Sequence, residues 1–365
     1  MKKYKVISKL NSTSMLVLIV FMSSSSLGQS ELSVSELVVA EMISKSIPGL
    51  SVSVITEGES IVQSFGIRNS DSTEFVNNET VFEAASLSKP VFALLVLELA
   101  QENVLDIDTP VHQYTTADSD FGAAFFEDDS YQKITPRMVL SHSSGLPNGT
   151  STPGKIHFEP GSDFAYSGTG FRYLAAAIET ITGRSLEVLL DEYVFQSLGM
   201  QDSSFLWRTE YSGNVAWGHD ASGKVTREIL HLEDVFPEGG LLTTIEDYSR
   251  FVGRIIERYQ AGDPVVTSMV SPAIVAEDYG TQGQMLWGLG WGIERASLGD
   301  RIWHTGSNGA FKSFVLVDLD TESAVIFFAN GENGLEIIPP LMRSTIGGTA
   351  LSDFYQRTIS ASLRY

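Results

Sequence analysis

Cysteine is absent from the 365-residue chain, and this absence excludes three kinds of chemistry. The chain can form no disulfide bond, bind no metal through thiolates and use no cysteine nucleophile. Its folded state must therefore be stabilised by a hydrophobic core alone. With 43 % hydrophobic residues, 19 % charged residues and 20 Phe, the composition is that of a globular protein and not of a disordered one.

The apolar run near the N-terminus is too short to cross a bilayer. It is MLVLIVFM, residues 15–22, whereas a spanning helix needs about 20 apolar residues. Four lysines precede the run and SSSSLGQS follows it, which is typical of a secretory signal peptide. We expect residues 1–28 to be removed after Gly28, leaving an exported protein, periplasmic or extracellular, with no stable membrane span. The alternative is an uncleaved membrane anchor.

Basic residues are scarce, with 24 Lys and Arg against 45 Asp and Glu and a net charge of −21. Residues 1–28 hold four lysines and no acid, so the mature chain carries −25. Such a charge argues against nucleic acid and anionic membrane surfaces as partners. The six histidines are scattered without the paired spacing of a zinc site, so we expect no metal and no cofactor.

Strand-like segments stand at both ends of the chain and helical segments lie between them. Residues 49–66 alternate apolar and polar around Glu57-Gly58, which predicts a hairpin. Helices are predicted over 87–101, 134–142, 169–182 and 186–198, with Gly183 and Gly199 at helix ends. From about residue 285 the stretches WGLGWGI, RIWHT, FKSFVLVDL and SAVIFFAN are each of strand length, and 336–348 and the tail after Leu351 look helical.

This order predicts an α/β protein of the α+β type. A mostly antiparallel sheet is expected from about 45–95 and 235–350, flanked by helices, and a helical region of about 96–234 is inserted into it. The domain would span 29–350, followed by a tail of 351–365. A cleft is expected between the two parts, where binding sites usually occur.

Ser86 and Lys89 form the first candidate site, in FEAASLSKPVFALL. Positions three apart lie on one face of a helix, so the hydroxyl and the amine can meet. Pro90 is tolerated only in a first turn, so the helix should begin at or just beyond Ser86, where backbone N–H groups favour an oxyanion. The alternative is an ordinary helix start capped by Ser86, with Lys89 in solvent.

Two further stretches bear on that choice. FEPGSDFAYSGTGF places Tyr166 in a loop after the Pro160-Gly161 turn, and RIWHTGSNGAF places His304-Thr305-Gly306 on what should be an edge strand. Together with Ser-x-x-Lys, and in this order, they resemble the serine β-lactamase and penicillin-binding protein superfamily, in the branch of class C β-lactamases, D-aminopeptidases and related esterases. The resemblance extends over about 45–345, with LSHSSGLP and EGGLLTTIEDYSRF as further signatures, and implies the β-lactamase/DD-peptidase-like fold.

The resemblance implies a role for each candidate residue. Ser86 is the nucleophile, Lys89 and Tyr166 shuttle the proton, and the backbone N–H groups of Ser86 and Ser307 form the oxyanion hole. Tyr166 is expected to be the base for deacylation. The resemblance also implies four substrate-binding residues: His304, Thr305, Gly306 and Gly168.

Gly168 departs from the common family pattern, which has Asn there, so amide and β-lactam recognition is in question. The Tyr-Ser-Gly form also resembles one seen in a sub-branch of the family, so the loss of Asn need not mean inactivity. His304 replaces a lysine and is mostly neutral at pH 7, which favours esters, D-amino acid amides or peptides. A solvent-facing strand position is the alternative for His304. For His142, near a helix end, we expect a structural hydrogen bond and not a catalytic role.

For this chemistry to run at pH 7, the pKa of either the Lys89 amine or the Tyr166 phenol must be lowered. Neutralising an unshifted lysine at that pH costs about 4.6 kcal/mol, and ionising a tyrosine costs about 4 kcal/mol. Desolvation would favour neutral Lys89, whereas a charged Lys89 would favour the Tyr166 phenolate, and the sequence leaves both open.

We therefore expect an exported serine hydrolase that acylates on Ser86 with a small ester, amide or peptide, such as one derived from the cell wall. The alternative is a penicillin-binding receptor, or a low-turnover acyl-binding protein, that keeps the cleft but hydrolyses poorly.

Overall fold

The computed structural model describes residues 33–116, 121, 125–127, 129–149, 155–278, 284–296 and 299–347. The expected signal peptide, the cleavage after Gly28 and the tail after Leu351 lie outside these residues. Among the described helices, none combines the length and the apolarity that crossing a membrane requires.

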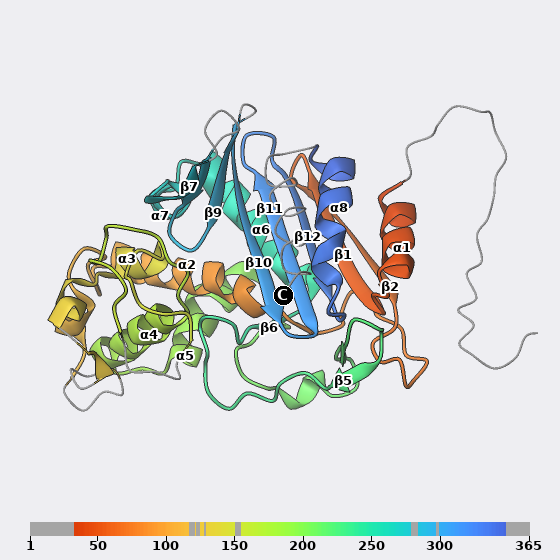
Figure 1. Cartoon of the computed structure of the whole chain (residues 1–365), viewed down its shortest axis with the longest axis horizontal. Helices are drawn as coiled ribbons and strands as arrows, with labels where there is room; N and C mark the ends of the chain where they lie inside the picture. Colours follow the sequence, from red (N-terminus) through yellow and green to blue (C-terminus); the bar gives the residue numbers. More distant parts are fainter. Residues whose placement is uncertain are drawn as a thin grey trace, which may run out of the picture. The chain divides into compact units, whose positions relative to one another are not determined.

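An eight-stranded antiparallel sheet forms the centre of the described structure (Figure 1). Its order is β2-β1-β12-β11-β10-β9-β8-β7. The strands are β1 (Gly49–Thr56), β2 (Glu59–Gly66), β7 (Ile274–Asp278), β8 (Gln284–Trp287), β9 (Gly292–Ala296), β10 (Gly299–Asn308), β11 (Phe311–Asp318) and β12 (Ser323–Ala329). The pairing of β1 with β12, Leu50 opposite Ala329, confirms that the two ends of the chain build one sheet.

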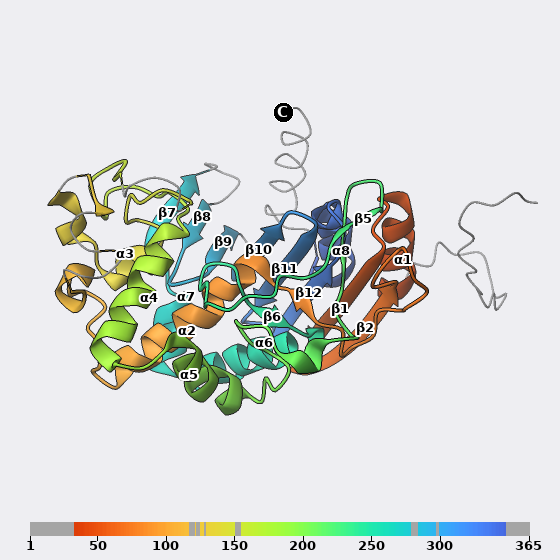
Figure 2. The same ribbon diagram turned by 90° about the horizontal axis from the view of Figure 1, so that it is seen from below.

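Helices cover both faces of this sheet. The helices α1 (Val34–Ser44) and α8 (Ile338–Thr345) lie on one face, and α6 (Ile245–Gln260) lies on the other (Figures 1 and 2). β12 shows why, because its residues alternate between two hydrophobic clusters. Ile326 and Phe328 pack on the α6 side, whereas Val325 and Phe327 pack with α1 and α8.

The inserted helical region begins with α2 (Ser88–Gln101) and continues through α3 (Pro136–Leu140), α4 (Thr169–Thr182) and α5 (Leu186–Leu190), which runs on as a π-helical turn over 191–196. These helices confirm the four predicted ones, and Gly183 and Gly199 take positive φ values of 64° and 70°. Short pairs join β3 (Phe82–Glu83) with β6 (Leu242–Thr243) and β4 (Gly218–His219) with β5 (Val225–Arg227). The remaining helix, α7 (Pro264–Val270), packs against α2 and α6.

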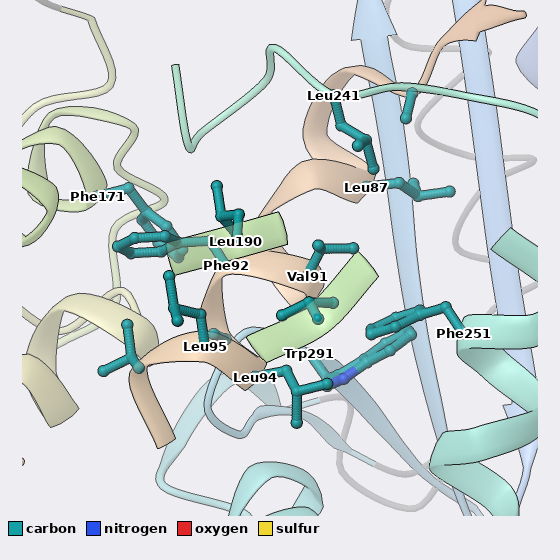
Figure 3. Packing of buried hydrophobic residues seen from close by; sticks show 14 of the residues in the cluster. Leu87, Val91, Phe92, Leu94, Leu95, Phe171, Leu190, Leu241, Phe251 and Trp291 are labelled. Carbon is teal, nitrogen blue, oxygen red and sulfur yellow. The ribbon is translucent and has the colours of Figure 1, made fainter. Parts of the chain in front are cut away.

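The helix α2 is buried around nearly its whole circumference, as expected of a helix that is apolar on all sides. It lies between the sheet and the other helices of the inserted region (Figure 2). Its contacts come from α4, α5, α6 and the β8–β9 turn. Figure 3 shows side chains of α2 and its cap (Leu87, Val91, Phe92, Leu94 and Leu95) together with side chains of the same cluster from other elements: Phe171, Leu190, Leu241, Phe251 and Trp291. The catalytic candidates Ser86 and Lys89 therefore stand at the start of a rigid central element.

Two predictions about local structure are wrong, and several helices were not predicted. WGLGWGI is not one strand: β8 ends at Trp287, the chain turns through Gly290 at φ 89°, and β9 starts at Gly292. β10 is not an edge strand, because it lies between β11 and β9. The helices that were not predicted are the amphipathic α6, together with α1 and α7.

Candidate active site

Ser86 lies in a tight turn between β3 and α2. The turn is a single 3₁₀ turn, Ala85–Leu87, and Ala85 adopts φ 50°, a left-handed conformation that alanine seldom takes. Its carbonyls are held from outside the turn, where Ser313 Oγ donates to Ala84 O at 2.6 Å and Ser88 Oγ donates to Ala85 O at 2.6 Å. The fold therefore fixes a strained turn that presents Ser86.

The sheet approaches this turn so closely that only glycine fits at 306. A Cβ on Gly306 would lie 2.1 Å from Ser313 Oγ and 2.5 Å from Ala84 O. The glycine of the third motif therefore lets β10 pack directly against the serine turn. The pairing of β10 with the described part of β9 ends at Trp303. His304, Thr305 and Gly306 therefore lie on a part of β10 that pairs only with β11 among the described strands.

Lys89 is only 2 % exposed, which excludes a lysine in solvent. Its Nζ donates to Ser86 Oγ at 3.2 Å and to the backbone carbonyl of Glu238 at 2.6 Å. Burial lowers the pKa of Lys89 to about 7, and the charge of Glu238 opposes that change. Because α2 begins at Ser88 and its cap, Leu87, has no side-chain bond, the reading of Ser86 as a helix cap is wrong.

Tyr166 lies in the loop before α4, with the Lys89 Nζ 4.7 Å from the centroid of its ring. The phenol oxygen is buried and has no partner in hydrogen-bonding geometry among the described residues. Burial raises the pKa of Tyr166, and the nearby hydroxyl of Ser86 opposes part of the rise. The two perturbations favour a neutral amine and a neutral phenol over a phenolate beside an ammonium.

Two buried histidines stand behind Tyr166. The ring of His142 lies 4.2 Å from that of Tyr166, and its Nδ1 accepts the Ser167 N–H at 3.0 Å. His142 therefore holds the Tyr166 loop, which is the structural role we expected. Burial, reinforced by the charge of Lys89, lowers the pKa of His304 to about 3 and that of His142 well below its usual value. A solvent-facing His304 is thus wrong, since its side chain is buried.

A cavity of about 420 Å³ opens at these residues. Its lining includes Ser86, Lys89, Tyr166 and Ser307, four of the predicted site residues, which come from three separate parts of the chain. The other predicted residues do not line it: His304, Thr305, Gly306 and Gly168. Their expected contact with substrate stays a prediction.

Sequence reasoning missed the other side chains of the cavity wall. An apolar side consists of Leu230, Leu232 and Phe236, and a polar side consists of Asn148, Arg172, Glu238 and Asn308. The Arg172 Nε donates to a Glu238 oxygen in an ion pair. EGGLLTT was noticed only as a signature, and neither pattern nor spacing indicated that its glutamate enters the site.

Gly168 lies beside this polar side. Its N–H donates to Asn148 Oδ1 at 3.1 Å, and a Cβ at 168 would meet Glu238 Cγ at 3.1 Å and Asn148 Oδ1 at 3.3 Å. The space that a larger side chain would need is thus occupied. As for metals, the described residues contain no group of three or more His, Asp or Glu side chains placed to hold an ion.

The chain is similar in sequence to a known protein family and to several of its members. The sequence model of the Beta-lactamase family matches residues 34–338. Penicillin-binding protein 4 of Amycolatopsis lactamdurans is 24 % identical over 333 residues, covering 83 % of this chain and 86 % of the relative. The Flp proteins of Staphylococcus aureus are 22 % identical over 322 residues, covering 81 % of this chain, and the chain spans 62 % of their length.

Solved structures with the same fold include an octameric penicillin-binding protein homologue from Pyrococcus abyssi, with a TM-score of 0.73 and 22 % identity over 87 % of this chain and 77 % of that one. D-alanine carboxypeptidase AmpC from Burkholderia cenocepacia gives a TM-score of 0.70 at 17 % identity, covering 85 % and 97 %. A class C β-lactamase mutant gives 0.70 at 19 %, covering 85 % and 96 %. The predicted β-lactamase-like fold is confirmed.

Proposed function

Since the chain belongs to the Beta-lactamase family of serine hydrolases, we propose that it is an exported enzyme that hydrolyses a small ester, amide or peptide through an acyl-enzyme on Ser86. The observation that carries this proposal is the 3.2 Å contact between Ser86 Oγ and a buried Lys89 whose pKa is lowered to about 7. At neutral pH about half of such lysines are neutral. The cost of about 4.6 kcal/mol for neutralising an ordinary lysine is then almost removed.

Acylation begins with the neutral Lys89 amine. Nζ takes the proton of Ser86 Oγ while Oγ forms a bond to the substrate carbonyl carbon. The carbonyl oxygen becomes an oxyanion, which the backbone N–H groups of Ser86 and Ser307 stabilise. When the tetrahedral intermediate collapses, the bond to the leaving alcohol or amine breaks and the proton from Lys89 passes to that group. The product is an acyl ester on Ser86.

Deacylation uses the same groups in reverse. Water attacks the ester carbonyl, gives a proton to Lys89, and the acid leaves as Ser86 regains its proton. The family resemblance implies that Tyr166 acts as a base, which requires the phenolate. The raised pKa of Tyr166 instead favours a protonated phenol, which can relay the proton between water and Lys89. The apolar wall of Leu230, Leu232 and Phe236 suits an apolar acyl or leaving group.

A substrate panel tests the proposal. Nitrophenyl esters, nitrocefin and D-alanyl peptides are offered to the mature protein and to Ser86→Ala. Repeated turnover by the wild type, lost in Ser86→Ala, supports the enzyme. Equal rates in both proteins would exclude Ser86 as nucleophile. N-terminal sequencing of the protein recovered outside the cytoplasm tests export, and a chain that starts at Gln29 supports it.

Gly168 favours a second candidate, a receptor that is acylated but turns over poorly. The family pattern has Asn at this position, and the structure fills the corresponding space with Glu238 and Asn148. The same panel separates the two functions. One equivalent of released nitrophenol followed by no further release supports the receptor, and continued release supports the hydrolase.

A further inference from the structure

We propose that the Arg172–Glu238 ion pair is a positioning device for the catalytic lysine: Arg172 fixes Glu238, and Glu238 holds the Lys89 amine against the Ser86 hydroxyl. This inference rests on the proposed function. It adds two positioning residues to the reaction and gives a reason for the glycine at 168.

The first step is the backbone contact to Lys89. A lysine side chain has four rotatable bonds, so one hydrogen bond to Ser86 at 3.2 Å leaves the amine poorly fixed. The shorter bond, 2.6 Å to the Glu238 carbonyl, supplies the second point. Two glycines follow Glu238, and they are held by Asn308 Nδ2, which donates to Gly239 O at 3.1 Å, and by the Phe236 carbonyl, which accepts both of their N–H groups. The side chain of Glu238 is a further point at which this segment can be anchored.

Arg172 provides that anchor from α4. Its Nε donates to Glu238 Oε1, and its guanidinium lies 4.5 Å from the centroid of the Phe236 ring. One side chain therefore holds two residues of the segment that carries the carbonyl. Because α4 begins directly after the Tyr166 loop, the same contact joins the segment to the loop that bears the phenol.

Gly168 leaves room for the Glu238 side chain. An added Cβ would approach Glu238 Cγ to 3.1 Å and Glu238 Cβ to 3.4 Å. The absence of a side chain at 168 thus leaves the Glu238 side chain uncrowded beside the start of α4. The departure from the family pattern and the ion pair are two parts of one arrangement.

Glu238 also sets the charge around the amine. The titratable groups that act on Lys89, or face it, are His142, His304, Tyr166 and Glu238. The first three are neutral at pH 7, because burial lowers the pKa of both histidines and raises that of the tyrosine. Glu238 raises the pKa of Lys89 against the effect of burial, and its Oε2 is buried with no partner among the described residues.

Glu238→Gln tests the pair, because glutamine keeps the size and the backbone carbonyl but removes the charge. We expect the midpoint of the pH profile of acylation by a nitrophenyl ester to move to lower pH, by about 1 unit, with little change above the midpoint. The matched control is Glu98→Gln. Glu98 pairs with Arg258 at 2.5 Å and does not line the cavity. The two pairs are buried to a similar degree: the glutamates are 22 % (Glu98) and 18 % (Glu238) exposed, and the arginines 25 % (Arg258) and 30 % (Arg172). Its midpoint should equal that of the wild type.

Arg172→Met tests the anchor. A misplacement of the amine by about 1 Å costs about 100-fold in rate, so kcat should fall on that order while KM changes little. A Glu238→Gln profile identical to the wild type, or an Arg172→Met kcat within twofold of it, overturns the inference. Should Arg172→Met fail to fold, the nearly isosteric Glu238→Gln decides alone. Failure of the proposed function looks different, since the wild type would then match Ser86→Ala.

Discussion

The acylation rate should depend on pH through a single group, the Lys89 amine. With a pKa of about 7, its neutral fraction is about one tenth at pH 6, one half at pH 7 and nine tenths at pH 8. The rate should therefore rise about tenfold between pH 6 and pH 8 and level off above pH 8. A lysine with an unshifted pKa would give a rise of about 100-fold over the same range, with no plateau.

The buried histidines and the tyrosine beside Lys89 should not distort this profile. Burial holds the pKa of His304 at about 3 and that of His142 well below its usual value, so both stay neutral throughout the range. Burial raises the pKa of Tyr166, so the phenol keeps its proton. One ionisation on the free enzyme should fit the data.

The assay is kcat/KM for a neutral nitrophenyl ester between pH 5.5 and 9, corrected for the hydrolysis seen with Ser86→Ala. Lys89→Met is the companion variant, and it should lose about 100- to 10,000-fold, the usual contribution of a general base. A continuous rise without a plateau, or a Lys89→Met protein that keeps the wild-type profile, would refute the assignment of Lys89 as the base.

Three further predictions concern stability and fit. Lys89→Met should raise the free energy of unfolding: the lowered pKa destabilises the wild type by about 4 kcal/mol at pH 7, offset by about 1–3 kcal/mol for the carbonyl left unpaired. Between pH 7 and about 10 the unfolded lysine binds more protons than the folded one, so the stability of the wild type rises with pH in this range. The stability advantage of Lys89→Met should therefore shrink toward pH 10, which thermal melts at several pH values would show. Gly306→Ala should lower the free energy of unfolding by about 1–3 kcal/mol or more and abolish labelling of Ser86. Gly253→Ala, at an uncrowded position of α6, should raise it by up to about 1 kcal/mol. Urea titrations in which both variants changed the free energy of unfolding in the same direction would contradict the packing argument. Gly168→Asn should reduce kcat by displacing the Glu238 side chain, so adding Glu238→Ala should cost little more in the double variant. A double variant as slow as the product of the two single effects would show that the residues do not compete for space.

The start of the site could be predicted because its signals are local. Ser86 and Lys89 are three residues apart, and Pro90 fixes where the helix begins, so the chain itself brings hydroxyl and amine together. The helix over 169–182 was predicted with its observed ends, since Gly183 supplies the positive φ that a helix end needs.

Glu238 could not be predicted because its contacts are distant. Its carbonyl meets Lys89 across 149 positions of sequence, and a backbone carbonyl leaves no mark on residue type. Arg172 was hidden for the same reason, as its partner lies 66 positions away. Only the folded chain shows that Gly168 and Glu238 share one space.

The helix α6 was missed although the sequence carries its signals. Thr244 caps the N-terminus by accepting the N–H of Asp247. The buried apolar residues then follow at helical spacing: Ile245, Tyr248, Phe251, Val252, Ile255 and Ile256. The stretch was included in the sheet part of about 235–350, and no helix was assigned to it.

The most direct test of the central claim is to find which residue becomes acylated. The mature protein is treated with a fluorescent phosphonate at pH 8, digested, and the labelled peptide is sequenced by mass spectrometry. We predict one adduct per chain on Ser86, none in Ser86→Ala and greatly slowed labelling in Lys89→Met. An adduct on any other residue, or equal labelling of Ser86→Ala, would contradict the account.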